Sequence, residues 1–247
     1  MILAAGLGTR LRPLTDLTPK PLLPINGRPL IHYTLAWIAS AGIRTVMINL
    51  HHKGELIRRS IGDGCRFGME VSYSEEPEIL GTGGGLKRVE AFLSDGPFLV
   101  VNADILTTLD PRALIAAHAA QRPVVTLAVR VDPEVERYGE IGLDATGRVR
   151  RLLGRGGRSD QPLRPVMFTG IHVVDPAVFA DIPARMFVPI TDAYIKLVER
   201  GAPVAGYLTD AFWIDIGTPD RYAEANRLVT TGLIRLIEPT PPDTASR

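Results

Sequence analysis

Short apolar runs alternate with helical repeats through the first half of the chain. Positions 31, 35 and 38 are apolar at helical spacing, and Gly42 stands where a glycine commonly follows the end of a helix. The runs 45–50 and 98–101 are continuous and rich in β-branched residues, which is typical of strands buried on both faces. This rhythm predicts an α/β fold with a mostly parallel sheet and helices on both of its faces.

The second half has a different pattern. Apolar positions on either side of a turn at 144–147 predict a hairpin, and the Arg-, Gly- and Pro-rich stretch 154–165 predicts a mobile loop. Further strands and helices follow, and the proline-rich tail 238–247 is predicted to be disordered. We therefore expect a single domain over 1–237, divided into halves at residue 130.

Composition limits the classes of protein that fit this pattern. The chain has 247 residues, 45% hydrophobic content and a net charge of +1, so neither a nucleic acid nor a membrane surface is expected as a partner. Its single cysteine, Cys65, forms no internal disulfide and belongs to no cluster of metal ligands. Because Met1 is almost inside the first apolar run, we expect no signal peptide and a cytoplasmic location.

The richest candidate chemistry lies in the first thirty residues. An apolar strand at 2–4 leads into Gly6-Leu7-Gly8-Thr9, and Arg10 and Lys20 follow. A strand that ends in a glycine-bearing turn offers backbone N–H groups to an anion, and the two cations adapt the site to a phosphate ester. Leu11 stands where a dinucleotide-binding fingerprint needs its third glycine, and the GTGGGLK stretch at 81–87 does not fit a Walker A loop.

These residues resemble a known family. The stretches LAAGLGTRLRPLT and PKPLLPINGRPLI look like the N-terminal motif of the sugar-1-phosphate nucleotidylyltransferases. Further elements that resemble the family recur in order at 81–85, 102–104, 169–171 and 213–218. The resemblance implies a Rossmann-like, doubly wound sheet, mostly parallel but mixed, with a smaller sugar-binding β-hairpin subregion. It also implies an enzyme that transfers a nucleoside monophosphate from a nucleoside triphosphate to a sugar-1-phosphate and releases pyrophosphate.

The resemblance assigns roles along the chain, with nucleotide binding in 1–130 and sugar binding in 131–237. Arg10 and Lys20 would be catalytic, since they would neutralise and position the reacting phosphates. Asp104 and Asp215, each just after an apolar strand, would hold Mg²⁺, which prefers oxygen ligands. The implied nucleotide-binding residues are Ala5, Gly6, Leu7, Gly8, Thr9, Gly81, Thr82 and Gly83. The implied sugar-binding residues are Gly139, Glu140, Thr169 and Gly170.

One departure from the family pattern leaves the substrate open. Many members carry a lysine after the hairpin that holds the sugar phosphate, whereas this chain offers Arg155 or Arg158, or only a solvated basic loop. The leading interpretation is a mannose-1-phosphate guanylyltransferase. The alternative is an N-acetylmuramate-1-phosphate uridylyltransferase or another hexose- or heptose-1-phosphate nucleotidylyltransferase. A non-catalytic nucleotide-sugar sensor and a glycosyltransferase are less favoured, because Arg10 and Lys20 are both present. The apolar strands of the second half leave room for a homo-oligomer, and the natural start of the chain is left open.

Overall fold

The computed structural model describes residues 1–157 and 161–238. This part of the chain forms two compact units, and each unit is assembled from separate stretches of sequence. Unit 1 comprises Met1–Glu78, Asn102–Pro111 and Ala211–Arg247, of which 239–247 lie outside the described residues, and unit 2 comprises Ile79–Val101 and Arg112–Asp210. The division therefore differs from the expected halves, because the chain passes between the units several times and residue 130 falls inside unit 2.

A parallel sheet forms the centre of unit 1. Its strands, in spatial order, are β1 (Ile2–Leu3), β4 (Thr45–Leu50) and β5 (Glu70–Glu75). In this sheet Ile48 of β4 lies opposite Ile2 on one side and Tyr73 on the other. All residues of β4 after Thr45 are buried. The buried strand predicted at 45–50 is confirmed.

The helices of unit 1 follow the predicted periodicity. They are α1 (Leu30–Ser40), α2 (Gly54–Ile61) and α8 (Pro219–Thr230). Gly42 adopts a φ of 80° just after α1, as the sequence predicts, and the Thr218 side chain caps α8 by accepting a hydrogen bond from Arg221 N. Short elements that the pattern does not reveal complete the unit: η1 (Thr9–Leu11), η2 (Leu14–Asp16), η3 (Lys20–Leu22), β2 (Pro24–Ile25), β3 (Arg28–Pro29), η4 (Cys65–Phe67), β7 (Ile105–Thr107) and β14 (Trp213–Asp215).

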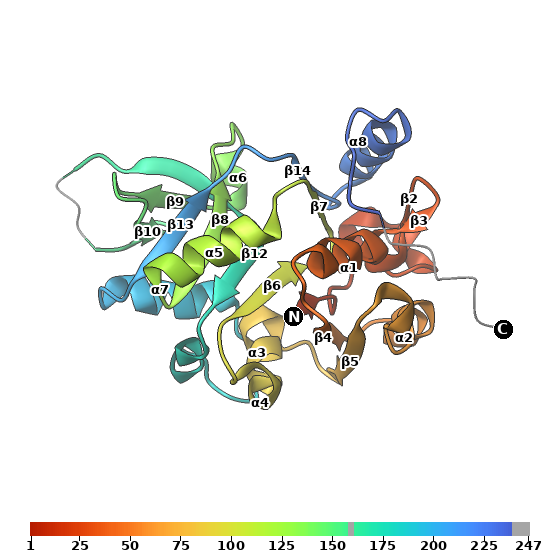
Figure 1. The fold of residues 1–247 in the computed structure, drawn as a ribbon, viewed down its shortest axis with the longest axis horizontal. Helices are drawn as coiled ribbons and strands as arrows, with labels where there is room; N and C mark the ends of the chain where they lie inside the picture. Colours follow the sequence, from red (N-terminus) through yellow and green to blue (C-terminus); the bar gives the residue numbers. More distant parts are fainter. Residues whose placement is uncertain (158–160, 239–247) are drawn as a thin grey trace. The chain divides into compact units, whose positions relative to one another are not determined.

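Segments from the two ends of the chain lie side by side in unit 1. Helix α8, in dark blue, lies beside β2 and β3, in red (Figure 1). The Tyr222 hydroxyl donates to the Pro24 carbonyl at 2.8 Å, and Asn226 Oδ1 accepts from Asn26 N at 2.9 Å. Of the predicted tail, only Glu238 belongs to the described residues, and its carboxylate pairs with Arg28 at 3.1 Å.

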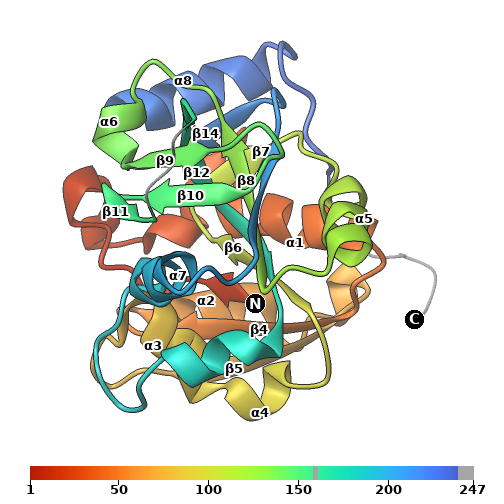
Figure 2. The same ribbon diagram turned by 90° about the vertical axis from the view of Figure 1, so that its left-hand side faces the viewer.

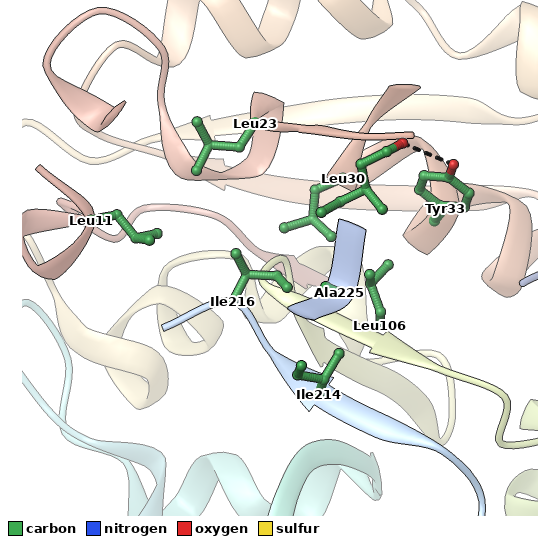
Figure 3. Close-up of a cluster of buried hydrophobic side chains, with 9 residues drawn as sticks. Leu11, Leu23, Leu30, Tyr33, Leu106, Ile214, Ile216 and Ala225 are labelled. Atoms are coloured by element: carbon green, nitrogen blue, oxygen red, sulfur yellow. Dashed lines mark hydrogen bonds between the residues drawn. The ribbon is translucent and has the colours of Figure 1, made fainter. Parts of the chain in front are cut away.

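An apolar core binds these segments together (Figure 3). It joins side chains from the first turns of the chain, from β7, from β14 and from α8: Leu11, Leu23, Ile25, Leu30, Tyr33, Leu106, Ile214, Ile216 and Ala225. A fully buried leucine or isoleucine contributes about 1.5–3 kcal/mol to folding relative to an exposed one. The core therefore fixes the segment around Arg10 and Lys20 against the two strands that adjoin Asp104 and Asp215.

Antiparallel pairs dominate unit 2. The long strand β12 (Arg164–Val174) pairs in antiparallel fashion with β6, β8 and β9, whereas β13 and β8 are parallel. The other strands are β6 (Phe98–Asn102), β8 (Val125–Arg130), β9 (Glu140–Leu143), β10 (Val149–Leu152), β11 (Arg155–Gly156) and β13 (Val204–Leu208). The mixed sheet is confirmed, with parallel pairs in unit 1 and mostly antiparallel pairs in unit 2.

The hairpin predicted around 144–147 is formed by β9 and β10, with Val149 opposite Leu143. Asp144 Oδ1 accepts from the backbone of Thr146 at 2.9 Å and of Arg148 at 3.0 Å, which stabilises the turn. The predicted loop 154–165 is partly ordered, because β11 extends the sheet beside β10. The segment 158–160 lies outside the described residues.

Helices cover parts of the unit 2 sheet. They are α3 (Gly81–Arg88), α4 (Glu90–Leu93), α5 (Pro111–Gln121), α6 (Val135–Tyr138), η5 (Pro176–Asp181) and α7 (Ile190–Glu199). Helix α7 lies against β10 and β11, as Figure 2 shows. The helical stretch that begins at Gly81 is divided at Val89 into α3 and α4. Across the described residues of both units, no helix has the length and apolarity that a membrane span requires.

Candidate active site

The glycine-bearing loop after β1 lies in unit 1 and turns through the short helix η1. Gly8 has a φ of 66°, and a Cβ on it would lie 3.1 Å from Thr15 Cγ2, so both the conformation and the space favour glycine. The Thr15 hydroxyl donates to the Gly8 carbonyl at 2.9 Å. A Cβ on Gly6 would meet nothing within 4 Å, and the Leu7 side chain is 45% exposed. The loop backbone is therefore accessible at Gly6 and Leu7 and braced at Gly8.

Lys20 stands in a short, rigid turn. Pro19 precedes it with a φ of −62°, Pro21 follows it and is buried, and Leu23 N donates to the Lys20 carbonyl at 3.1 Å. The Lys20 ammonium donates to Asp104 Oδ2. The side chains are 13% and 27% exposed, respectively, so this ion pair is largely shielded from water. Two residues that are 84 positions apart in sequence thus meet.

The two candidate metal ligands lie on adjoining strands. Strands β7 and β14 pair in antiparallel fashion, with Asp215 opposite Ile105. The backbone N–H of Ile216 donates to the Asp104 carbonyl at 2.8 Å, so Asp104 lies beside the end of β14. Ala103 N also donates to the Leu3 carbonyl at 3.0 Å, which brings Asp104 to the end of β1. Asp215 is thus the last residue of β14, and Asp104 immediately precedes β7, whereas the binding of a metal ion by the two stays a prediction.

Arg10 belongs to the same group of side chains. A Cβ placed on Gly217 would lie 2.5 Å from Asp215 Oδ2 and 3.4 Å from Arg10 Nη2. The Arg10 guanidinium and the Asp215 carboxylate therefore share the space beside Gly217. A side chain at 217 would force the Asp215 carboxylate to shift and would touch Arg10, which gives this glycine a physical reason that the sequence alone did not reveal.

Arg221 is a site residue that sequence reasoning missed. Its Nη1 donates to Asp215 Oδ1 at 2.6 Å, and the two side chains are only 20% and 16% exposed. Its guanidinium carbon also lies 5.8 Å from the centre of the Trp213 ring. The sequence does carry one signal for it. Arg221 lies in the first turn of a helix that begins a few residues after Asp215, so its side chain can point back toward that carboxylate. Two carboxylates and three cations thus gather around β7 and β14.

This arrangement fits a small divalent cation shared with phosphates. Among the described residues, no group of three or more His, Cys, Asp or Glu side chains could enclose a metal ion. Mg²⁺ needs no such cage, since it is commonly held by one or two carboxylates together with substrate phosphates and water. Asp104 and Asp215 supply carboxylate oxygens of the kind that Mg²⁺ prefers. The donor set is therefore compatible with magnesium.

The GTGGG stretch lies in unit 2 and begins helix α3. Its backbone pairs with the segment 186–190: Gly83 N donates to the Val188 carbonyl and Val188 N to the Leu80 carbonyl, both at 2.8 Å. The Thr82 hydroxyl accepts from Ile190 N at 2.8 Å, at the start of α7. A Cβ on Gly81 would lie 2.8 Å from the Val188 oxygen. Close packing on 186–190 is thus a sufficient reason for these glycines, and nucleotide binding by Gly81, Thr82 and Gly83 stays a prediction.

The predicted sugar-binding residues also lie in unit 2. The Thr169 hydroxyl donates to the Ala128 carbonyl at 2.8 Å, and the residue is 2% exposed, so this side chain has a structural partner. Gly170 has a φ of 77° at the place where the register between β12 and β8 shifts, which is typical of a bulge. Gly139 has a φ of 89° just before β9, and the exposed Glu140 begins that strand. Contact of these residues with a sugar stays a prediction.

Arg155 and Arg158 are the candidate replacements for the sugar-phosphate lysine of the family. The Arg155 guanidinium pairs with Glu199 Oε1 on α7 at 2.9 Å, which ties β11 to that helix. Arg155 therefore has a structural partner, whereas Arg158 lies outside the described residues. No phosphate-binding role is assigned to either residue by these contacts.

Comparison with known proteins shows the family of this chain. The model of a family described as nucleotidyl transferase matches residues 1–232. The chain belongs to this family. A relative from Mycobacterium tuberculosis, named mannose-1-phosphate guanylyltransferase, is 33% identical over 245 residues, which cover 98% of this chain and 66% of the relative. A second relative, the N-acetylmuramate alpha-1-phosphate uridylyltransferase of Neisseria meningitidis, is 34% identical over 231 residues, covering 92% of this chain and 96% of the relative.

Solved structures of nucleotidyl transferases share the fold. A UDP-glucose pyrophosphorylase from Acinetobacter baumanii superposes with a TM-score of 0.80 and 17% identity, covering 95% of this chain and 94% of that chain. At this identity the likeness concerns the fold alone. It confirms the Rossmann-like mixed sheet expected from the sequence. Some curated relatives are longer, since the chain spans 65% and 66% of two of them.

Proposed function

We propose that this chain is a magnesium-dependent sugar-1-phosphate nucleotidylyltransferase. It would transfer a nucleoside monophosphate from a nucleoside triphosphate to a sugar-1-phosphate, giving an NDP-sugar and pyrophosphate. The observation that carries this proposal is the meeting of Lys20, Asp104, Asp215 and Arg10 beside strands β7 and β14. Membership of the nucleotidyl transferase family supports the reaction class.

The reaction makes demands that these side chains can meet. A phosphate oxygen of the sugar ester attacks the α-phosphorus, and pyrophosphate leaves from the opposite side. Both reactants are anions, so catalysis consists mainly of positioning and charge neutralisation, and no covalent nucleophile is needed. Arg10 would bind the phosphates that leave. Lys20 would bridge the attacking phosphate and the α-phosphate as a point charge.

The pairing of Lys20 with Asp104 suggests how the site responds to substrate. Each charge offsets the other in the described structure. A phosphate oxygen that bound the Lys20 ammonium would leave Asp104 Oδ2 available to a cation. The Asp215 carboxylate is paired with Arg221, which holds it in place. Asp104 and Asp215 would then hold Mg²⁺, which when bound neutralises phosphate charge.

For the substrate, the leading proposal is GTP with mannose-1-phosphate. It is supported by the name of the Mycobacterium relative, which matches nearly the whole of this chain. The alternative is UTP with N-acetylmuramate-1-phosphate, supported by the Neisseria relative, whose length is nearly covered by the match. The cytoplasmic location, the absence of a nucleic-acid or membrane partner and the homo-oligomer expected from the sequence stay predictions.

A grid of substrates tests the proposal. The purified protein is incubated with magnesium and each pairing of four or more nucleoside triphosphates with a panel of hexose- and heptose-1-phosphates, and pyrophosphate release is followed. We expect one pairing to dominate, and Asp104→Ala and Lys20→Ala each to abolish release while the circular dichroism spectrum is unchanged. No turnover anywhere in the grid by a folded protein would contradict the proposal. Consumption of an NDP-sugar with an acceptor, in place of pyrophosphate release, would favour a glycosyltransferase.

A further inference from the structure

The loop that carries Arg10 is held at its start by a buried amide. Asn49, near the end of β4, accepts a hydrogen bond from Ala4 N at 2.8 Å through Oδ1. Its Nδ2 donates to Glu76 Oε1, also at 2.8 Å. Asn49 and Glu76 are 3% and 2% exposed. Because β1 ends at Leu3, this bond fixes the first residue of the loop after the strand has ended.

A lysine holds the other end of the same loop. The Lys53 ammonium donates to the Thr15 carbonyl at 3.0 Å and also to the Asp16 carbonyl. Thr15 in turn donates its hydroxyl to the Gly8 carbonyl at 2.9 Å, and its methyl group packs on Gly8. The ammonium is therefore one residue removed from the glycine turn. Asn49 lies in β4, and Lys53 lies in the short connection between β4 and α2.

Lys53 has a backbone conformation that is unfavourable for a lysine. Lys53 has a φ of 55°, in the left-handed region that favours glycine or asparagine. It precedes Gly54 at the start of α2, and its side chain does not cap that helix. A residue held in an unfavourable conformation needs a compensating interaction elsewhere. The two hydrogen bonds from the ammonium to the loop carbonyls are such an interaction.

We propose that Lys53, together with Asn49, is a positioning residue that presets the loop 4–16 for the triphosphate. The inference rests on the proposed function, in which this loop binds the nucleotide. Among the hydrogen bonds of the described residues, the Lys53 ammonium reaches the loop through the backbone carbonyls of Thr15 and Asp16, so it acts on the geometry of the loop and not on the reacting atoms. Loss of the ammonium leaves the loop free to move, and the free loop binds phosphates less well.

The test uses Lys53→Gly in the full chain. Glycine suits the left-handed backbone, so the variant is expected to keep or raise the Tm, which a merely structural role would not allow. We expect the KM for the nucleoside triphosphate to rise about 10- to 100-fold. The kcat and the KM for the sugar-1-phosphate should change by less than about threefold. Lys53→Arg, which retains a cation able to bond the carbonyls, should restore most of the affinity.

A matched control lies on the helix that follows Lys53. Arg59 is exposed on α2, so Arg59→Met removes one positive charge from this helix, and its kinetics should match the wild type. Hydrogen exchange supplies a readout that is independent of turnover. Amides in the peptide covering 4–16 should exchange about tenfold faster in Lys53→Gly than in the wild type or in Arg59→Met.

The possible results distinguish a failure of the positioning role of Lys53 from a failure of the proposed function. An unchanged triphosphate KM in Lys53→Gly, a fall in kcat with KM constant, or a large drop in Tm would overturn the positioning role. Unchanged exchange in the loop would overturn it as well. If the wild type shows no turnover in the substrate grid, the proposed function fails, while the exchange experiment still judges the anchor. Asn49→Leu offers a second variant, expected to loosen the start of the loop in the same exchange assay.

Discussion

Two glycine-rich segments in this protein look alike in sequence but differ in their surroundings. In unit 1, a Cβ on Gly6 would meet open space within 4 Å. In unit 2, a Cβ on Gly84 would lie 2.6 Å from the Met186 carbonyl oxygen, and one on Gly83 would lie 3.0 Å from the Val188 oxygen. The first segment leaves backbone accessible to a ligand, whereas the second brings two backbone segments together. Whether a glycine-rich segment can bind a ligand or serves close packing therefore depends on the residues that surround it in the fold.

The polar groups around the two segments differ in the same sense. Near the loop of unit 1, Lys20 is paired with Asp104 and Arg221 with Asp215. The glycines of unit 2 lead through Thr82 to α7, where Tyr194 lies edge-on to His172, with ring centres 5.6 Å apart. Within the described residues, the buried ring nitrogens of His172 have no hydrogen-bond partner. Charged side chains thus cluster beside the loop of unit 1, whereas this part of unit 2 is a region of apolar packing.

The largest effect on activity is expected from a substitution among the charged side chains of unit 1. Lys20→Met removes the cation that pairs with Asp104, and we expect pyrophosphate release to fall about a thousandfold or more, because charge neutralisation dominates phosphoryl transfer. Stopped or continuous pyrophosphate assays measure this. A Lys20→Met enzyme with most of its turnover would remove the reason for placing the active site in unit 1.

The second prediction concerns the packed glycines. Gly84→Ala places a Cβ against the backbone of Met186, so we expect a loss of about 1–3 kcal/mol in the free energy of unfolding, measured by urea denaturation. Gly157→Ala is the control, since a Cβ there meets no atom of the described residues within 4 Å. Equal stability of the two variants would show that the GTGGG segment is not held by 186–190.

The third prediction tests how apolar the region behind this segment is. Burial lowers the pKa of His172 from 6.5 to about 3. Between these values the unfolded chain binds a proton that the folded chain does not, so stability falls as the pH drops from 6.5 toward 3. At pH 5 the loss relative to pH 7 is about 2 kcal/mol. His172→Phe retains the aromatic contacts, and its unfolding free energy should fall less on acidification. Identical pH profiles for both proteins would place the titration elsewhere.

The smallest effect on stability is expected at the open glycine. Gly6→Ala should change the free energy of unfolding by less than about 0.5 kcal/mol, because the added methyl group meets open space. The triphosphate KM should nevertheless rise, since the methyl group stands where a phosphate would approach the backbone. A stability loss as large as that of Gly84→Ala would erase the contrast between the two segments.

Much of the local structure follows from the sequence alone. The strand at 45–50 and the glycine after α1 at Gly42 are found as predicted, because a continuous β-branched run and a helix-ending glycine are governed by local physics. The position of Asp104 shortly after β6 and of Asp215 at the end of β14 could also be approached from the sequence, since apolar runs end visibly. Short elements such as β7 and η3 were missed, because pieces of three residues carry no periodicity.

The contacts that make the site were decided by tertiary structure. Sequence indicated Arg10, Lys20 and the two aspartates as separate candidates, and family resemblance gave them roles. Only the folded structure shows that Lys20 pairs with Asp104, that Arg221 pairs with Asp215, and that Lys53 donates to the loop carbonyls. Such pairs join residues far apart along the chain, and their geometry depends on the packing of β7, β14 and α8 around one core. Residue type and local pattern thus determined which groups could act, while long-range packing decided which of them meet.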